Sequence, residues 1–446
     1  MANDTVAAIA TPAGRGGIGI VRITGSGLEP MLGALVTGEV MPRRATRADF
    51  RDADDNVIDQ GLVLYFPAPH SYTGEDIIEL HAHGGPVVLQ LLLKRCLELG
   101  ARIAEPGEFT KRAFLNEKLD LAQAESVADL IDASTATAAR CAVRSLQGEF
   151  SGQIEALVQA LTELRMLVEA TIDFPEDEVD SLERGNAKSR LQDLQRRLSQ
   201  IMAVSRQGRL LREGIQVVLA GQPNVGKSSL LNSLAGTERA IVTEIPGTTR
   251  DTIRETIDLD GVPLHIIDTA GLREPRDAVE KIGIERTWEA VTQADLVLWV
   301  SDATRVETSV ADAALAMRLP IGVPQLRVIN KIDLVNAVPD KQDALTATEV
   351  AVSAKTGAGL EQLRSAMLNA VGWAGSGEGL FMARERHLHA LQVAIQHLDN
   401  AAALTRELEL FAEELKLAQN ALASVTGEVT ADDLLGQIFS RFCIGK

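Results

Sequence analysis

A chain of 446 residues suffices for roughly two to four domains, each able to bury its own core. A net charge of −18 and an aromatic fraction of 3% argue against a broad nucleic-acid-binding surface, which would be basic and would offer rings for base stacking. Three cysteines without a CxxC pair exclude a disulfide framework and a zinc cluster. No apolar run approaches the length that spans a membrane, so we expect a cytoplasmic protein without a membrane partner.

The first part of the chain alternates short apolar runs with turns. Runs at 6–10, 18–23 and 61–65 predict strands, and a helix is predicted over 86–99 with Gly100 at its C-terminal cap. We therefore expect a compact α+β domain over 1–118. His81 and His83 lie within it, but no third metal ligand accompanies them, so we expect structural packing for both.

From residue 119 the pattern changes to long amphipathic helices. Apolar residues recur at intervals of three and four in three segments, which predicts the seams of a helical bundle. The seam residues are Ile154, Leu157, Leu161, Leu164 and Val168; Leu191, Leu194, Leu198 and Ile201; and Leu388, Leu391, Ile395 and Leu398. Two segments precede the block described next and one follows it. We therefore expect one discontinuous all-α domain, 119–213 and 373–446, with an acidic inter-helix loop at 173–178 and a return linker at 375–379.

A phosphate-loop motif, G-x-x-x-x-G-K-S, occupies 221–228 between a predicted strand at 215–220 and a predicted helix at 230–234. Glycines allow the backbone N–H groups to surround a triphosphate, the lysine reaches the β- and γ-phosphates, and the serine hydroxyl ligates Mg²⁺. The predicted GTP-binding residues of this loop are Gly221, Asn224, Val225, Gly226, Lys227, Ser228 and Ser229.

Three further motifs follow in order, each after a strand-like run. Asp268 precedes Thr269, Ala270 and Gly271, and an Asp at this place holds Mg²⁺ through water. Asn330, Lys331 and Asp333 offer a carboxylate that accepts the two donors of the guanine edge, whereas the backbone of Ser353, Ala354 and Lys355 reads the guanine carbonyl. The series resembles the Ras-like GTPase superfamily, so we expect an inserted α/β P-loop domain over 214–372.

The segments between these motifs narrow the class. Leu272 stands where Ras-type enzymes carry the glutamine that orients the attacking water. Asn224 and the sequence at 243–251 resemble the potassium-activated GTPases instead. That resemblance implies K⁺ ligands at Asn224, Thr243, Ile245 and Thr248, an Mg²⁺ ligand at Thr249, and nucleotide contacts from Thr243, Glu244, Ile245, Pro246, Gly247, Thr248 and Thr249. Glu280 is the candidate for positioning water, and the alternative is a solvated helix charge.

The whole chain resembles the bacterial tRNA modification GTPase family MnmE, also called TrmE. The resemblance rests on the segments at 14–22, 74–81 and 106–120 and on the Cys-Ile-Gly-Lys sequence at 443–446, together with the split helical pattern. It implies a folate-binding N-terminal domain that forms a homodimer, with folate contacts from Arg22, Glu79, Lys118 and Lys446. Glu79 could pair with the pterin donor edge and the cations with the folate glutamate tail, and the alternative is ordinary surface charge. Cys443 is either a nucleophile toward the uracil ring or a thiol that helps to hold the tail.

The resemblance also implies a function. The chain would be a K⁺-activated GTPase that, with an FAD-dependent partner resembling MnmG, adds a (carboxymethyl)aminomethyl group to C5 of the wobble uridine of certain tRNAs. Its cofactors would be GTP, Mg²⁺, K⁺ and a tetrahydrofolate derivative in the 5,10-methylene or 5-formyl form, with FAD on the partner of a heterotetramer. A ribosome-assembly GTPase would predict a basic RNA-binding module after the GTPase block, and a membrane-recruited GTPase would predict a basic amphipathic helix; the sequence has neither feature.

Overall fold

The computed structural model describes residues 4–173, 186–222, 224–235, 255–268, 293–304, 322–335, 348–375, 379–404, 407–428, 432–440 and 442–445. The chain folds into two compact units. Unit 1 comprises 1–128, 146–166 and 412–446, and unit 2 comprises 129–145 and 167–411. The boundaries fall inside the helices α4 (Leu121–Asp132), α6 (Glu149–Asp173) and α14 (Leu408–Thr426) and at the end of α5 (Ala136–Leu146).

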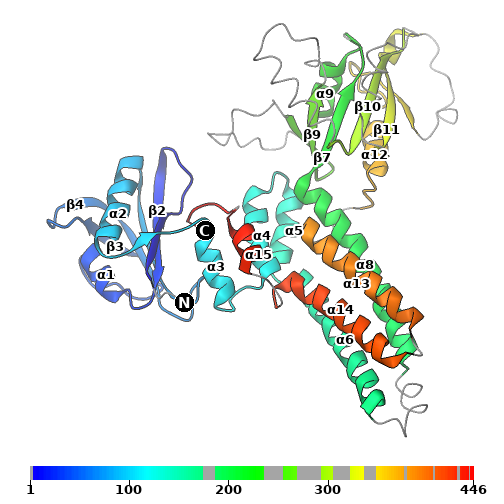
Figure 1. Cartoon of the computed structure of the whole chain (residues 1–446). Coiled ribbons are helices and arrows are strands. Elements are labelled where there is room, and N and C mark those ends of the chain that lie inside the picture. The colour runs from blue at the N-terminus through cyan, green and yellow to red at the C-terminus, as the bar shows by residue number, and fades with distance from the viewer. Residues whose placement is uncertain are drawn as a thin grey trace, which may run out of the picture. The chain divides into compact units, whose positions relative to one another are not determined.

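A six-stranded sheet in the order β3-β4-β5-β2-β1-β6 is the centre of unit 1 (Figure 1). The strands are β1 (Val6–Ile9), β2 (Gly16–Gly25), β3 (Thr46–Arg51), β4 (Val57–Phe66), β5 (Asp76–Gly84) and β6 (Arg102–Ile103). Neighbours are antiparallel except β1 and β6. Helix α2 (Pro86–Glu98) packs against β1, β2, β4 and β5, and α1 (Glu29–Leu35) packs against α2 and β3. The predicted α+β architecture is confirmed.

Helix α3 (Glu108–Leu115) is fixed in unit 1 by a buried ion-pair network. The Arg112 guanidinium lies 2.9 Å from Glu75, 2.9 Å from Glu108 and 3.0 Å from Asp4. Arg112 is 9% exposed, and a buried cation of this kind is stable only when its hydrogen-bond donors are satisfied. The network therefore holds α3 against the start of β1 and the approach to β5. Helices α4 and α15 (Asp432–Phe439) share an apolar cluster that includes Leu121, Leu435 and Phe439.

Unit 2 contains a second six-stranded sheet, in the order β12-β11-β10-β7-β9-β8 (Figure 1). The strands are β7 (Ile215–Ala220), β8 (Glu255–Leu259), β9 (Val262–Asp268), β10 (Leu296–Asp302), β11 (Gln325–Asn330) and β12 (Glu349–Ala351). All pairs are parallel except β8 with β9. Parallel strands end at one edge of a sheet, so the residues that follow β7, β10, β11 and β12 gather there. Helices α9 (Lys227–Ala235) and α12 (Leu360–Ala370) and the 3₁₀ turn η3 (Ile332–Leu334) complete the predicted α/β domain.

Two long helices of unit 2, α8 (Ala187–Glu213) and α13 (Glu385–Ala403), pack against each other. The predicted seam of α8 is confirmed, because Leu191, Leu194, Leu198 and Ile201 are all buried. The predicted seam of α13 is wrong at Leu388 and Ile395, which are only half-buried. Its buried residues are His387, Ala390, Leu391, Ala394, Leu398 and Ala401. Alanines make much of the contact, since small side chains allow close helix approach.

The β8–β9 hairpin and helix α5 join one apolar core. Ala138, Cys141 and Ala142 of α5 belong to the same buried cluster as the strands β7 to β12. At the hairpin turn the Thr135 hydroxyl donates to the Gly261 carbonyl at 2.8 Å. A Cβ on Gly261 would lie 2.4 Å from the Thr137 hydroxyl, so only glycine fits this contact.

Candidate functional site

The phosphate loop joins β7 to α9 and has a backbone that only its glycines permit. Gly221 has a φ of 138° and Gly226 a φ of 93°, and Asn224 between them has a φ of 65°. A Cβ on Gly221 would lie 2.2 Å from the Val300 carbonyl oxygen, and one on Gly226 would lie 2.4 Å from Nδ2 of Asn330. The loop is therefore pressed against β10 and the end of β11, with no space for side chains at the two glycines.

The cationic and hydroxyl groups of the loop occupy the start of α9. Nζ of Lys227 donates to the Gly221 carbonyl at 2.6 Å, so the ammonium lies across the loop. Ser228 and Ser229 are exposed in the first turn of the helix. Exposed N–H groups at a helix start, a lysine and a hydroxyl form a donor set that suits a phosphate with its divalent cation. The position of Ser228 is thus compatible with its predicted role as an Mg²⁺ ligand. The side chain of Asp268, the other predicted ligand at this edge, lies outside the described part of the structure.

Asn330 connects three of the predicted motifs through one buried amide. It is 1% exposed, and its Nδ2 donates to the Val225 carbonyl at 2.9 Å. Its Oδ1 accepts from the backbone N–H of Lys331 at 2.8 Å and of Ala354 at 3.1 Å. Because this buried side chain bonds all three segments, Asn330 fixes the distance between the phosphate loop and the two predicted guanine-reading segments.

Lys331 is held by a carboxylate that the sequence motifs did not point to. Its Nζ lies 2.6 Å from Oδ2 of Asp302 and 2.7 Å from the Asn224 carbonyl. The hydrogen bond from Lys331 lowers the pKa of Asp302 to about 2, and the Thr304 hydroxyl donates a further bond to this carboxylate at 2.7 Å. One signal in the sequence could have identified Asp302: it ends an apolar run, and a strand formed by that run would place it at the carboxyl edge of the sheet.

Asp333 and Ser353 lie together at the same edge. The Ser353 hydroxyl donates to Oδ1 of Asp333 at 2.7 Å, and Ser353 is fully buried whereas Asp333 is exposed. A buried hydroxyl that fixes one carboxylate oxygen orients the whole carboxylate. The Ser233 hydroxyl donates to the Ala354 carbonyl at 2.6 Å, which links α9 to the last motif, and Lys355 is exposed.

A second group of predicted site residues meets on β2 and β5 of unit 1. Nε of Arg22 lies 2.9 Å from Oε1 of Glu79, and Nε2 of His81 lies 3.1 Å from Oε2. The Arg22 guanidinium is 5.7 Å from the centre of the Phe109 ring and donates to the Gly445 carbonyl at 3.3 Å. Both oxygens of the Glu79 carboxylate are therefore already bonded, and the arginine also contacts the C-terminal tail.

The C-terminal tail lies in unit 1 against β1 and the start of α3. The Gly107 N–H donates to the Cys443 carbonyl at 3.3 Å, and a Cβ on Gly445 would lie 2.6 Å from the Ile9 carbonyl oxygen. Cys443 itself is exposed, in contrast to Cys96, whose burial raises the pKa of its thiol to about 12.

Two further predictions for unit 1 concern Lys118, a predicted folate contact, and His83, which was expected to pack structurally. Lys118 is exposed beside Gly74, and in the described part of the chain it has no bond to Arg22 or Glu79. The expectation that His83 packs structurally is wrong. Its side chain is 74% exposed, and its Nδ1 bonds Asp59 at 2.9 Å.

Comparisons with known proteins identify the family. The family model of the GTP-binding protein TrmE N-terminus matches residues 5–118, and that of the MnmE helical domain matches residues 121–443. The tRNA modification GTPase MnmE of Azoarcus sp. (strain BH72) is 58% identical over 99% of this chain and 98% of its own length. That of Nitrosomonas eutropha is 59% identical over 100% of this chain and 99% of its own length. The chain belongs to the MnmE family of tRNA modification GTPases.

Membership in the MnmE family confirms the predicted class of enzyme, a GTP hydrolase of tRNA modification. Among solved structures, Era of Aquifex aeolicus bound to GDP·AlF₄⁻ is 28% identical over 41% of this chain and 66% of its own, with a TM-score of 0.28. A superposition with so low a score supports no argument about this chain.

Part of the predicted MnmE-type site falls outside the described residues. These positions are Thr243, Glu244, Ile245, Pro246, Gly247, Thr248, Thr249, Thr269, Ala270, Gly271, Glu280 and Lys446. Within the described ranges, no helix has the length and apolar character needed to cross a membrane. The same ranges contain no group of three or more His, Cys, Asp or Glu that could hold a metal ion.

Proposed function

We propose that this MnmE family member is a K⁺-activated GTPase that acts with an FAD-dependent partner resembling MnmG. Together they would add a (carboxymethyl)aminomethyl group to C5 of wobble uridine in certain tRNAs, with the one-carbon unit taken from a tetrahydrofolate derivative. FAD would belong to the partner. The chain would form a homodimer through residues 1–118 and a heterotetramer with the partner in the cytoplasm.

The GTP-binding part of the proposal rests on the three hydrogen bonds of the buried Asn330 amide. A buried amide that joins the phosphate loop to the segments of Lys331 and Ala354 would fix the separation of the proposed phosphate and base sites. Preorganisation of this kind reduces the ordering cost of binding. Asp333, oriented by Ser353, would accept the two donors of the guanine edge, and adenine lacks the second donor.

Two cations would complete the phosphate site. Ser228 would hold Mg²⁺, and the exposed Asn224, in a left-handed backbone conformation, would contribute to the K⁺ site. When bound, these ions would neutralise the negative charge that develops on the phosphates in the transition state. The protein's part is to hold the triphosphate with the loop amides and Lys227. The predicted roles of Thr249, Asp268 and Glu280 belong to the same proposal.

The folate part is supported by the Arg22–Glu79–His81 group. Arg22 is shared between Glu79 and the tail carbonyl of Gly445, so a folate carboxylate bound to Arg22 would lie beside the tail. His81 would hold Glu79 in place through its bond to Oε2 while the remaining lone pairs of that carboxylate accept the pterin donors. Lys118 and Lys446 are the remaining proposed contacts, and Cys443 would act either as a nucleophile or in holding the tail.

The test is GTP turnover of the full chain in KCl and in NaCl at equal ionic strength. We expect K⁺ to raise the rate at least about tenfold and Asn224→Ala to abolish the increase, because one cation ligand of a transition-state charge is worth a few kcal/mol. Asn232→Ala, at an exposed position of α9, is the matched control and should keep the K⁺ effect. Equal rates in both salts would remove K⁺ from the proposal while leaving GTP hydrolysis in place.

A further inference from the structure

Helix α8 is strongly basic in a strongly acidic chain. Its 27 residues contain seven Lys and Arg and two Asp and Glu, so the helix has a net charge of +5 where the chain has −18. The long helix α6, by contrast, contains one Arg and five Asp and Glu. Helix α8 is therefore a locally basic element of unit 2.

The exposed side of α8 carries a stripe of six residues that are cationic or uncharged, with Asp193 beside it as the pairing partner of Arg196. Its members are separated by three or four residues, so they lie on one face of the helix, and all of them are exposed. We call this the α8 stripe: Lys188, Gln192, Arg196, Ser199, Ala203 and Arg206. From Lys188 to Arg206 a helix rises about 27 Å at 1.5 Å per residue, which is long enough to pass several phosphates of a nucleic-acid strand.

The two end cations of the stripe, Lys188 and Arg206, are both exposed. Among the residues that the structure describes, Lys188 and Arg206 form no ion pair, whereas Arg196 pairs with Asp193 on the neighbouring face. Ion pairs on helices usually satisfy such cations. Within the described ranges, Lys188 and Arg206 thus differ from Arg196 in having no carboxylate partner.

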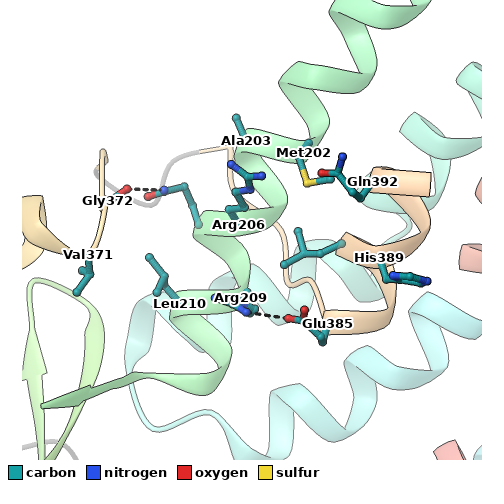
Figure 2. A pocket seen from close by; sticks show the side chains of 12 residues that line it. Met202, Ala203, Arg206, Arg209, Leu210, Val371, Gly372, Glu385, His389 and Gln392 are labelled. Carbon is teal, nitrogen blue, oxygen red and sulfur yellow. Dashed lines mark hydrogen bonds and ion pairs between the residues drawn. The ribbon is translucent and has the colours of Figure 1, made fainter. Parts of the chain in front are cut away.

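A cavity of about 660 Å³ lies at the C-terminal end of the stripe (Figure 2). Arg206 and Arg209 line it from α8, and His389 and Gln392 line it from α13. Glu385 is the one carboxylate of the described lining, and it is neutralised by Arg209 at 2.7 Å. The Arg206 cation and the His389 ring are suited to a phosphate group. The apolar wall, which consists of Met202, Leu210 and Leu388, is suited to the carbon skeleton attached to it.

We propose that the α8 stripe and this cavity bind the phosphate backbone of a folded RNA. This inference rests on the proposed function, because tRNA is the RNA that such an enzyme would meet. A line of exposed cations with serine and glutamine between them resembles a phosphate-contacting surface, and a cavity at one end would fix the register of the strand. The surface also resolves the difficulty that the whole chain repels a polyanion, since attraction needs only a local basic region.

The experiment measures binding of the full chain to a tRNA transcript with a wobble uridine by fluorescence anisotropy at several salt concentrations. The triple variant Lys188→Gln, Arg196→Gln, Arg206→Gln removes the cations of the stripe. We expect binding weaker by about ten- to a hundredfold, and a slope of log K against log salt that is smaller by about 2, because each lost phosphate contact removes about 0.7–0.9. The control Arg44→Gln, Arg47→Gln, Lys94→Gln changes the net charge equally at exposed positions of unit 1 and should leave both quantities nearly unchanged.

A second pair of variants separates charge from helix stability. Ala203→Glu places a carboxylate in the middle of the stripe, whereas Ala203→Gln adds a side chain of the same shape without charge, and both residues suit a helix. Only Ala203→Glu should weaken RNA binding. Equal losses for the stripe variant and its unit 1 control, or for Glu and Gln at 203, would overturn the proposal. The proposal would also be overturned if the stripe variant kept its RNA binding but lost the complex with the FAD-dependent partner. That result would assign the surface to a protein. GTP turnover of every variant should equal that of the wild type, so failure of this inference leaves the K⁺ test untouched.

Discussion

Single buried side chains at the carboxyl edge of the unit 2 sheet hold together the segments of the predicted phosphate and base sites. Asn330 unites three segments, and Asp302 holds Lys331 at 2.6 Å beside the Asn224 carbonyl. The motif residues at this edge were predictable because their types and order carry the chemistry. Asp302 was not, since a carboxylate that acts only by holding a lysine has no spacing signature of its own.

The contribution of Asp302 can be measured by Asp302→Asn. We expect the free energy of unfolding at pH 7 to fall by about 1–3 kcal/mol, because the Lys331 ammonium loses a charged acceptor, and guanine-nucleotide affinity to fall with it. The folded carboxylate has a pKa of about 2, below its ordinary value of 3.8, so its stabilisation is present above pH 3.8 and is lost as the pH falls toward 2. The difference between wild type and variant should therefore shrink over that interval.

The measurement is urea unfolding followed by tryptophan fluorescence at a series of pH values. Glu361→Gln is the control, because this carboxylate is 83% exposed on α12 and should change stability by no more than about 0.5 kcal/mol. A constant difference between wild type and Asp302→Asn down to pH 2 would contradict the assignment of the lowered pKa to the bond with Lys331.

At the scale of elements, α8 and the chain that enters α13 approach each other very closely. A Cβ on Gly208 would lie 2.0 Å from the Phe381 carbonyl oxygen. This contact explains why a glycine is tolerated inside a helix, where alanine is normally preferred. Apolar periodicity predicted α8 and its seam correctly. For α13 it was wrong at Leu388 and Ile395 and missed the buried alanines, which carry little weight in a search for large apolar residues.

Gly208→Ala tests which of two opposing effects is larger. Helix propensity favours alanine by about 1 kcal/mol, whereas the clash with the Phe381 backbone costs about 1–3 kcal/mol or more because backbone cannot move as a side chain does. We expect net destabilisation, seen as a lower midpoint of thermal unfolding. Gly152→Ala on α6 is the matched control, since its Cβ meets nothing within 4 Å, and it should stabilise the chain by about 0.5–1 kcal/mol.

At the scale of the whole molecule, the inserted GTPase domain is connected to the helices by the neck cluster, which consists of Asp129, Arg212 and Arg384. Asp129 is 6% exposed and lies 2.9 Å from Arg212, which precedes β7, and 2.7 Å from Arg384, which precedes α13. The segment that enters the insertion and the segment that follows it are thus both bound to one carboxylate, that of Asp129. The sequence predicted the insertion from helical patterns on both sides of the block, but the carboxylate that joins them lies on α4, far from either segment in sequence.

Asp129→Asn removes the charge that the two arginines share. We expect a loss of about 3 kcal/mol, because two partly buried guanidinium groups lose the charged acceptor that they share. We expect differential scanning calorimetry to show one joint transition for the GTPase sheet and the α8–α13 pair in the wild type and two separate transitions in the variant. Asp260→Asn is the control, an exposed residue at a φ of 51° that asparagine also adopts. A single unchanged transition in Asp129→Asn would show that the apolar core alone couples the two parts.

The contact at Gly261 has a mechanical consequence. Strand β9 begins beside that turn, which is bonded to Thr135, and ends at Asp268 on the carboxyl edge. Its seven residues span about 20 Å, and as an interior strand paired on both sides it resists bending. The predicted nucleotide-contacting segments at 243–251 and 269–271 flank this hairpin in the chain. A shift of Asp268 along the strand direction would therefore move the Gly261 turn as well. Through the bond from Thr135 to Gly261, β9 mechanically couples the carboxyl edge of the sheet to the loop between α4 and α5.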